Sequence, residues 1–144
     1  MAPVFFNRTY DETFDLLLEA RDYLAHREPL DRRELGPDDR LVVNCEALRL
    51  TSRLTQIMAW LLVQKAVHAG EMTRAEAASG QHRLSGQAVC LTREVVGGYP
   101  IPARLRSLLD RSYNLYTRVE RLDALVARAS PGASSSARGP GSVC

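Results

Sequence analysis

The sequence predicts an all-α fold, an antiparallel bundle of three long helices with short additional helical segments. Apolar residues recur at intervals of three and four along most of the chain, the period of an amphipathic helix. No segment shows the strict apolar–polar alternation that is typical of a strand. Hydrophobic residues make up 45% and charged residues 25% of the 144 residues, which is the composition of a globular chain.

The first long helix is expected at about residues 9–27. Thr9 and Glu12 have the spacing of a capping box, in which two side chains bond free backbone N–H groups at a helix start. The apolar residues on one face are Tyr10, Phe14, Leu17, Leu18, Leu24 and Ala25. We expect Pro29 to end this helix, because the residue before a proline is disfavoured in the helical conformation. A polar loop at about 28–37 follows.

The second helix, at about 38–69, is the longest. Pro37 suits a first helical turn, and Gly70 suits the position after the last one. One apolar row comprises Leu41, Cys45, Leu48, Ser52, Thr55, Ala59, Leu62 and Ala66, and a second comprises Val43, Ala47, Leu50, Leu54, Ile57 and Leu61. So wide an apolar arc indicates a helix that is central in the bundle or offers one face to a second chain. We predict a homodimer, because a symmetric pair would bury the surplus.

Short helices are expected at about 74–79, where Thr73 and Glu76 form another capping box, and at about 87–96. Gly97–Pro102 is expected to be a turn before the third long helix, at about 102–129. Its heptad-like apolar row is Leu105, Leu108, Ser112, Leu115, Val119, Leu122 and Val126, and its outer face carries Arg104, Arg111, Arg118 and Arg121. Residues 1–129 are therefore one helical domain, and the Ser-, Gly- and Pro-rich residues 130–144 are expected to be a flexible tail.

The charges are unevenly distributed. Residues 1–39 carry five arginines and ten acidic residues, whereas residues 102–144 carry seven arginines and three acidic residues. This asymmetry predicts neighbouring antiparallel segments with complementary polar edges. Nucleic-acid binding is not favoured, because Asp110, Glu120 and Asp123 lie among the arginines of the last helix.

The sequence contains no motif of a known catalytic, cofactor or metal site, so we expect neither an enzyme nor a cofactor. The three histidines lie far apart, and the cysteines have no metal-ligand spacing. Cys45 and Cys90 lie on apolar rows and are expected to be small buried residues. The longest apolar run has seven residues, Ile57–Val63, too few for a membrane span, and no basic segment precedes the first apolar residues. A cytoplasmic protein is the expectation.

A polar stripe lies opposite the apolar rows of the second helix. It comprises Glu46, Arg49, Arg53, Gln56, Trp60 and Gln64. Because Trp and Arg are enriched at binding hot spots, this stripe is the candidate partner-binding face. The alternative is that Trp60 packs over the edge of the bundle with arginine stems beside it.

The second helix also carries a recognisable sequence. The string Asn44-Cys-Glu-Ala-Leu-Arg-Leu-Thr-Ser-Arg-Leu-Thr-Gln-Ile-Met-Ala-Trp-Leu-Leu-Val-Gln-Lys-Ala-Val, followed by Gly70-Glu-Met-Thr, resembles the alphaproteobacterial RcdA-like family, named after the regulator of CtrA degradation. The similarity continues through Val89-Cys-Leu, Leu105-Arg-Ser-Leu-Leu-Asp-Arg-Ser and Leu115-Tyr-Thr-Arg-Val, and covers about residues 9–127.

The resemblance implies a small helical, dimer-forming adaptor that assists regulated proteolysis by the ClpXP protease. Such an adaptor works with a response-regulator adaptor and delivers cell-cycle regulators. The stripe on the second helix is our inference from periodicity and is not implied by the family. The alternatives are a small helical regulator that binds nucleic acid, a helical dimer with no role in proteolysis, or an enzyme with a site between the helices.

Overall fold

The computed structural model describes residues 3–92 and 101–129, with side chains from residue 6. The elements are α1 (Pro3–Asp22), the π-helix η1 (Tyr23–Arg27), α2 (Glu28–Arg33), α3 (Pro37–His68), α4 (Arg74–Ala77), the 3-10 helix η2 (Gly80–His82), α5 (Gln87–Cys90) and α6 (Ala103–Ala129). These described ranges contain no strand. The predicted all-α class and the three long helices are confirmed.

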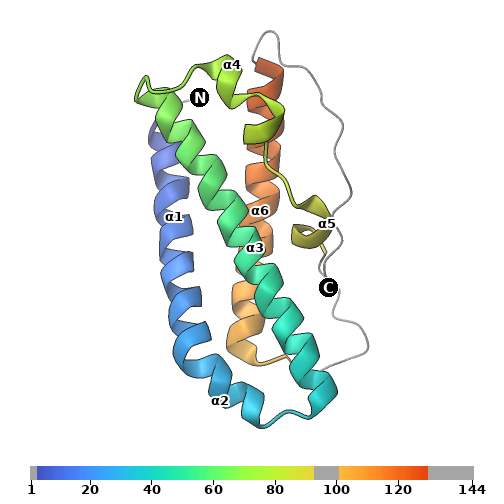
Figure 1. Cartoon of the computed structure of the whole chain (residues 1–144). Coiled ribbons are helices and arrows are strands. Elements are labelled where there is room, and N and C mark those ends of the chain that lie inside the picture. Colours follow the sequence, from blue (N-terminus) through green and yellow to red (C-terminus); the bar gives the residue numbers. More distant parts are fainter. Residues whose placement is uncertain (1–2, 93–100, 130–144) are drawn as a thin grey trace.

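The three long helices α1, α3 and α6 lie side by side, with α3 packed against both of the others (Figure 1). α1 runs antiparallel to the other two. α3 and α6 run in the same direction, because the segment that joins them returns along the length of the bundle (Figure 1). The predicted heptad-like row of α6 is buried from Leu105 to Leu122. The bundle therefore has one continuous core between the three helices.

α1 begins earlier than the capping box predicts. It starts at Pro3, so Thr9 lies inside the helix, where it is buried and its carbonyl accepts a 2.7 Å hydrogen bond from the Thr13 hydroxyl. The reason is packing at the start of the chain. Phe6 is 3% exposed and its ring lies 5.9 Å from that of Trp60, so the buried face of α1 extends beyond Thr9 toward the N-terminus.

The prediction that Pro29 ends the first helix is wrong. The chain passes through the π-turn η1, in which the Glu28 N–H group bonds the Tyr23 carbonyl, and continues as α2. A proline clashes with the carbonyl four residues earlier and lacks an N–H group, and a wider turn before it relieves both problems. Pro29 then lies in the first turn of α2, where a proline is tolerated. The connection to α3 shrinks to residues 34–36.

Both predicted ends of α3 are confirmed. Pro37 is in its first turn, and Gly70 has φ +76°, the left-handed conformation that glycine adopts without strain. The Gly70 N–H group bonds the Val67 carbonyl, and the Glu71 N–H group bonds the Ala66 carbonyl. These two bonds form a Schellman motif, which satisfies carbonyls at the helix end.

The two short helices are present but shorter than predicted. Thr73 caps α4, because its hydroxyl accepts a 3.1 Å bond from the Glu76 N–H group, and α4 ends at Ala77. α5 begins at Gln87 as predicted and ends at Cys90. The first four residues of the predicted turn at Gly97–Pro102 and the predicted tail at 130–144 lie outside the described residues.

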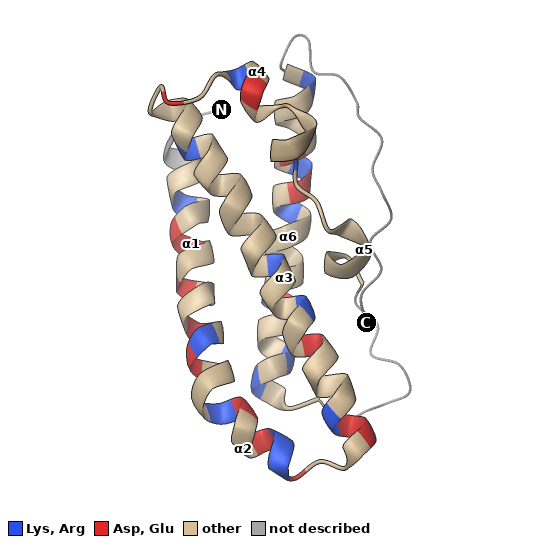
Figure 2. Ribbon diagram, in the orientation of Figure 1, with Lys and Arg blue, Asp and Glu red and all other residues tan. Residues whose placement is uncertain are grey.

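Complementary charges join α1 to α6, as the charge asymmetry predicts (Figure 2). Two nitrogens of Arg111 donate to the two carboxylate oxygens of Glu19, at 2.6 and 2.7 Å. About two helical turns further along α6, Arg118 donates to Glu12 at 2.7 Å. These ion pairs set the edge along which the two antiparallel helices meet.

We predict a small pH-dependent contribution from the Glu19–Arg111 pair. The hydrogen bond from Arg111 holds the pKa of Glu19 below its ordinary value. The pair therefore stabilises the fold at neutral pH, and this stabilisation is lost as the pH falls through the lowered pKa. Because both side chains are nearly half exposed, Arg111→Ala should lower the free energy of unfolding at neutral pH by less than about 1 kcal/mol.

An NMR titration of the Glu19 carboxyl group tests this prediction. Its pKa should rise toward the ordinary value in Arg111→Ala and should not change in Arg121→Ala, which alters an exposed arginine on the same helix. An unchanged pKa in the first variant would show that the pair does not form in solution.

Candidate functional site

The polar stripe of α3 lies inside the bundle. Glu46, Arg49, Arg53, Trp60 and Gln64 are all buried, with exposed fractions between 1% and 7%, and only Gln56 is partly exposed. The prediction that this stripe forms an exposed partner-binding face is therefore wrong. Its physical cause is the segment that precedes α6, which covers this side of α3 and takes up its polar groups.

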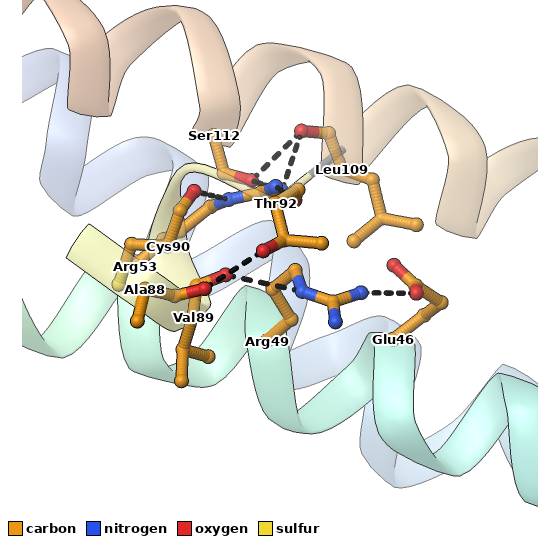
Figure 3. A network of polar contacts seen from close by, with 9 residues as sticks. All are labelled: Glu46, Arg49, Arg53, Ala88, Val89, Cys90, Thr92, Leu109 and Ser112. Atoms are coloured by element: carbon orange, nitrogen blue, oxygen red, sulfur yellow. Dashed lines mark hydrogen bonds and ion pairs between the residues drawn. The ribbon is translucent and has the colours of Figure 1, made fainter. Parts of the chain in front are cut away.

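Arg53 is the centre of this buried network (Figure 3). It is 1% exposed and its guanidinium group contacts two elements at once. Nε donates to the Cys90 carbonyl at 2.7 Å, and Nη2 donates to the Thr92 carbonyl at 2.7 Å. Nη1 donates to the Leu109 carbonyl at 3.0 Å and to the Ser112 hydroxyl at 3.3 Å. One side chain of α3 thus fixes the end of α5 and the first half of α6.

Arg49 extends the network by one turn (Figure 3). Its Nε donates to the Val89 carbonyl at 3.1 Å, and its Nη1 forms a buried ion pair with Glu46. The last carbonyls of a helix have no partner within the helix and need one from outside. Arg49 and Arg53 supply that partner to the carbonyls of Val89 and Cys90, so two arginines of α3 cap α5.

Burial shifts the pKa values of Arg53 and Cys90 in this cluster. Burial, and then the nearby Arg49 cation, lower the pKa of Arg53. Three main-chain carbonyls, a hydroxyl group and the ring of Tyr113, 5.3 Å away, compensate the lost hydration of the guanidinium. Burial also raises the pKa of the Cys90 thiol, which is fully buried, as predicted for a small core residue. Cys45 is only partly buried.

Gln56 ties α3 to the loop before α5. Its side-chain oxygen accepts a 2.8 Å bond from the Ser85 hydroxyl, while the Ser85 carbonyl accepts a 2.7 Å bond from the Tyr116 hydroxyl of α6. Gly86 follows with φ +79°, and a Cβ atom there would lie 3.3 Å from the sulfur of Cys90 and 3.5 Å from Gln56. A larger residue would be strained and crowded at this position.

Trp60 is a packing residue and not an exposed anchor. Its indole Nε1 donates to Asp123 of α6 at 3.0 Å, and Arg83 donates to the same carboxylate at 3.0 Å. Its ring packs against Phe6 of α1. The alternative that places Trp60 against the bundle is supported, and Trp60 joins all three long helices.

The exposed surface of α3 is the first of its two apolar rows. We call this the outer row: Leu41, Cys45, Leu48, Ser52, Thr55, Ala59, Leu62 and Ala66. Leu41, Leu48 and Leu62 are 64%, 57% and 50% exposed, whereas Leu50, Ile57 and Leu61 of the other row are fully buried. α3 therefore turns its charges inward and a row of leucines outward. The wide apolar arc in the sequence signalled this face.

Three cavities among the described residues have volumes of about 90, 260 and 260 Å³. One of about 90 Å³ lies between the ends of α1, α3 and α6 and is lined by Phe6, His68 and Gln64, among others. The amide nitrogen of Gln64 is buried, with no hydrogen-bond partner in the described part of the chain. Typical small-molecule sites enclose about 300–1,000 Å³. This cavity is well below that range.

The described ranges hold no group of three or more His, Cys, Asp or Glu side chains placed to bind a metal ion. No helix within them combines the length and the hydropathy that a bilayer crossing requires.

Comparison with known proteins places the chain in a family. The model of a family described as "Protein of unknown function (DUF1465)" matches residues 1–140. The chain belongs to this family. Among solved structures, this DUF1465 protein is similar to the crystal structure of RcdA from Caulobacter crescentus CB15, with 35% sequence identity and a TM-score of 0.70. The match covers 87% of this chain and 92% of the RcdA chain, and it is consistent with the RcdA-like resemblance of the sequence. No curated protein sequence matches the chain.

We predict that Arg53 is among the most destabilising positions to substitute in this DUF1465 protein. Arg53→Met keeps most of the side-chain volume but removes the donor of the Cys90 and Thr92 carbonyls. The Leu109 carbonyl and the Ser112 hydroxyl still bond each other. Each buried group that loses its partner costs about 1–3 kcal/mol, so the free energy of unfolding should fall by about 3 kcal/mol or more. Chemical denaturation measures this loss.

Two further variants sharpen this test. Arg53→Lys retains the charge but lacks the planar fork of donors, so it should recover only part of the loss. Arg106→Met, an exposed arginine on α6, should change the free energy of unfolding by no more than about 0.5 kcal/mol. Equal effects of Arg53→Met and Arg106→Met would contradict the buried network.

Proposed function

We propose that this protein is a non-enzymatic, cytoplasmic adaptor that binds other proteins and assists regulated proteolysis by ClpXP. The observation that carries this proposal is its 35% identity to RcdA over nearly the whole of both chains. By resemblance to the regulator of CtrA degradation, its partners are the ClpX machinery, a response-regulator adaptor and the delivered cell-cycle regulators.

The ionisable groups whose pKa values depart from their ordinary values have structural roles, which supports a non-enzymatic protein. Arg53 holds main-chain carbonyls, and Cys90 and Tyr116 lie in the core. Glu19 and Arg111 pair with each other at the α1–α6 edge. Each group thus has a structural task, whereas an active site would gather such groups around a pocket.

The outer row of α3 supports a protein-binding function and a homodimer. From Leu41 to Gln64 the only charged residues are Glu46, Arg49 and Arg53, and all three are buried. The exposed side of α3 is therefore uncharged for more than six turns. Exposed apolar surface of this extent is typical of an interaction site. We propose that a second copy of the chain covers it.

Nucleic-acid binding is the alternative function, and the structure does not favour it. It would require a contiguous surface of free arginines. Of the four arginines expected on the outer face of α6, Arg111 and Arg118 form ion pairs with carboxylates of α1. Binding to DNA or RNA that falls steeply with salt concentration would nevertheless support this alternative over the adaptor.

The adaptor proposal predicts longer protein half-lives in cells that lack this chain. A small set of proteins should be degraded more slowly, measured by pulse-chase labelling and mass spectrometry. The same proteins should be stable in cells without ClpX, and removing this chain from those cells should change nothing further. Purified ClpX or a response regulator should also be captured by the purified chain.

A folded chain whose loss leaves the half-life of every ClpX-dependent protein unchanged would contradict the proposal. It would support a helical dimer with no role in proteolysis.

A further inference from the structure

The outer row of α3 alternates in size. At every seventh position it carries a larger residue: Leu41, Leu48, Thr55 and Leu62. The positions between them carry smaller residues: Cys45, Ser52, Ala59 and Ala66. The intervals along the row are four and three in strict alternation, which is the seam of a two-stranded coiled coil. This seam runs for about 38 Å along the helix, at 1.5 Å per residue.

We propose that the outer row pairs with the outer row of a second copy in antiparallel orientation, with the two-fold axis at the peptide bond between Arg53 and Leu54. This inference rests on the proposed two-copy state and specifies the face, the direction and the register of its interface. Three independent features of the described residues lead to this geometry: side-chain size, the position of the hydroxyl groups and the charges at the two ends of α3.

Side-chain size fits the antiparallel register along the whole row. About this axis Leu41 meets Ala66 of the second copy, Leu48 meets Ala59, and Leu62 meets Cys45. Each exposed leucine therefore faces a small residue, and every layer of the interface has a similar volume. In a parallel pair, layers of two leucines would alternate with layers of two small residues, which leaves gaps that cost packing energy.

The hydroxyl groups specify the register. Ser52 meets Thr55 of the second copy on either side of the axis, so the polar pair lies at the centre of the interface, polar against polar. A slip by one heptad places Ser52 against Leu48 or Leu62 and buries a hydroxyl group beside an apolar side chain. Burying a hydroxyl group without a partner is unfavourable, and such polar positions specify the register of coiled coils.

Charge complementarity specifies the direction. The first turn of α3 carries Asp38 and Asp39, followed by Arg40, and its last turn carries Lys65 and His68. The Lys65 and His68 side chains also contact the rings of Tyr10 and Phe6 of the same chain, respectively. Antiparallel pairing places the acidic turn of one copy beside the basic turn of the other, at both ends of the interface. Parallel pairing would bring the four aspartates together, and like charges at close range repel each other. The opposed helix dipoles favour the same direction.

Disulfide cross-linking between two single-cysteine chains tests this geometry. The background is Cys45→Ala and Cys144→Ser, with the buried Cys90 retained. Leu48→Cys and Ala59→Cys are made in separate chains; both positions are exposed, so the fold is preserved. Along one helix these positions lie about 16 Å apart. A disulfide requires Cα atoms about 4.4–6.8 Å apart, so only a specific pairing of two copies links them.

The antiparallel register predicts that the mixture of Leu48→Cys and Ala59→Cys chains forms a covalent dimer under mild oxidation, and that neither chain does so alone. Leu48→Cys mixed with Ala66→Cys is the control for a slip of one heptad and should stay uncrosslinked. Cross-linking of each single variant with itself, with no mixed dimer of a Leu48→Cys chain and an Ala59→Cys chain, would establish a parallel pair and overturn the inference.

Sedimentation of the unaltered chain separates this inference from the two-copy state on which it rests. A species of twice 16.0 kDa with the wrong cross-linking pattern overturns the proposed geometry of the interface but not the two-copy state. A single 16.0 kDa species at micromolar concentration overturns the two-copy state and the register together.

Discussion

The buried guanidinium of Arg53 is the interaction on which the rest of the structure depends. It bonds the end of α5 and the first half of α6 from one position on α3, and so fixes the returning segment against both helices. A charge that is this deeply buried needs every one of its donors satisfied. The polar side of α3 must therefore face inward, and its outer row must face away from the bundle.

This orientation links the internal packing of the chain to its function. A helix whose charged residues are used inside has only uncharged residues left for its exposed side. Leu41, Leu48 and Leu62 are exposed because Arg49 and Arg53 are buried. The same constraint that attaches α5 to the bundle thus creates the surface that we assign to a second copy. In the proposed adaptor, the remaining surfaces of the bundle are available for the protease machinery and its substrates.

Much of the fold could be predicted from local sequence, because periodicity and helix ends depend on neighbouring residues. The three helices, Pro37, the Gly70 terminus, the Thr73 cap and the charge complementarity of α1 and α6 are of this kind. Pro29 was misleading, since a π-turn absorbs it without ending the helix. The start of α1 also depended on a contact distant in sequence, that between Phe6 and Trp60.

The candidate site could not be predicted in the same way. Which side of α3 faces inward depends on carbonyls almost 40 residues away, at Val89, Cys90 and Thr92, and no local pattern reports them. A stripe of arginines with a tryptophan is typical both of a binding face and of a buried hydrogen-bond network between helices. The wide apolar arc of the sequence nevertheless indicated that one apolar face of α3 is not covered by the rest of the bundle.

Hydroxyl-radical footprinting of the unaltered chain, read by mass spectrometry over a range of protein concentrations, tests the inverted orientation of α3 most directly. We expect the leucines of the outer row to be oxidised in dilute solution and protected as the concentration rises. Trp60 should stay protected throughout, although its side chain is intrinsically reactive, because it is 2% exposed. Rapid oxidation of Trp60, with Leu41, Leu48 and Leu62 protected at every concentration, would contradict the account.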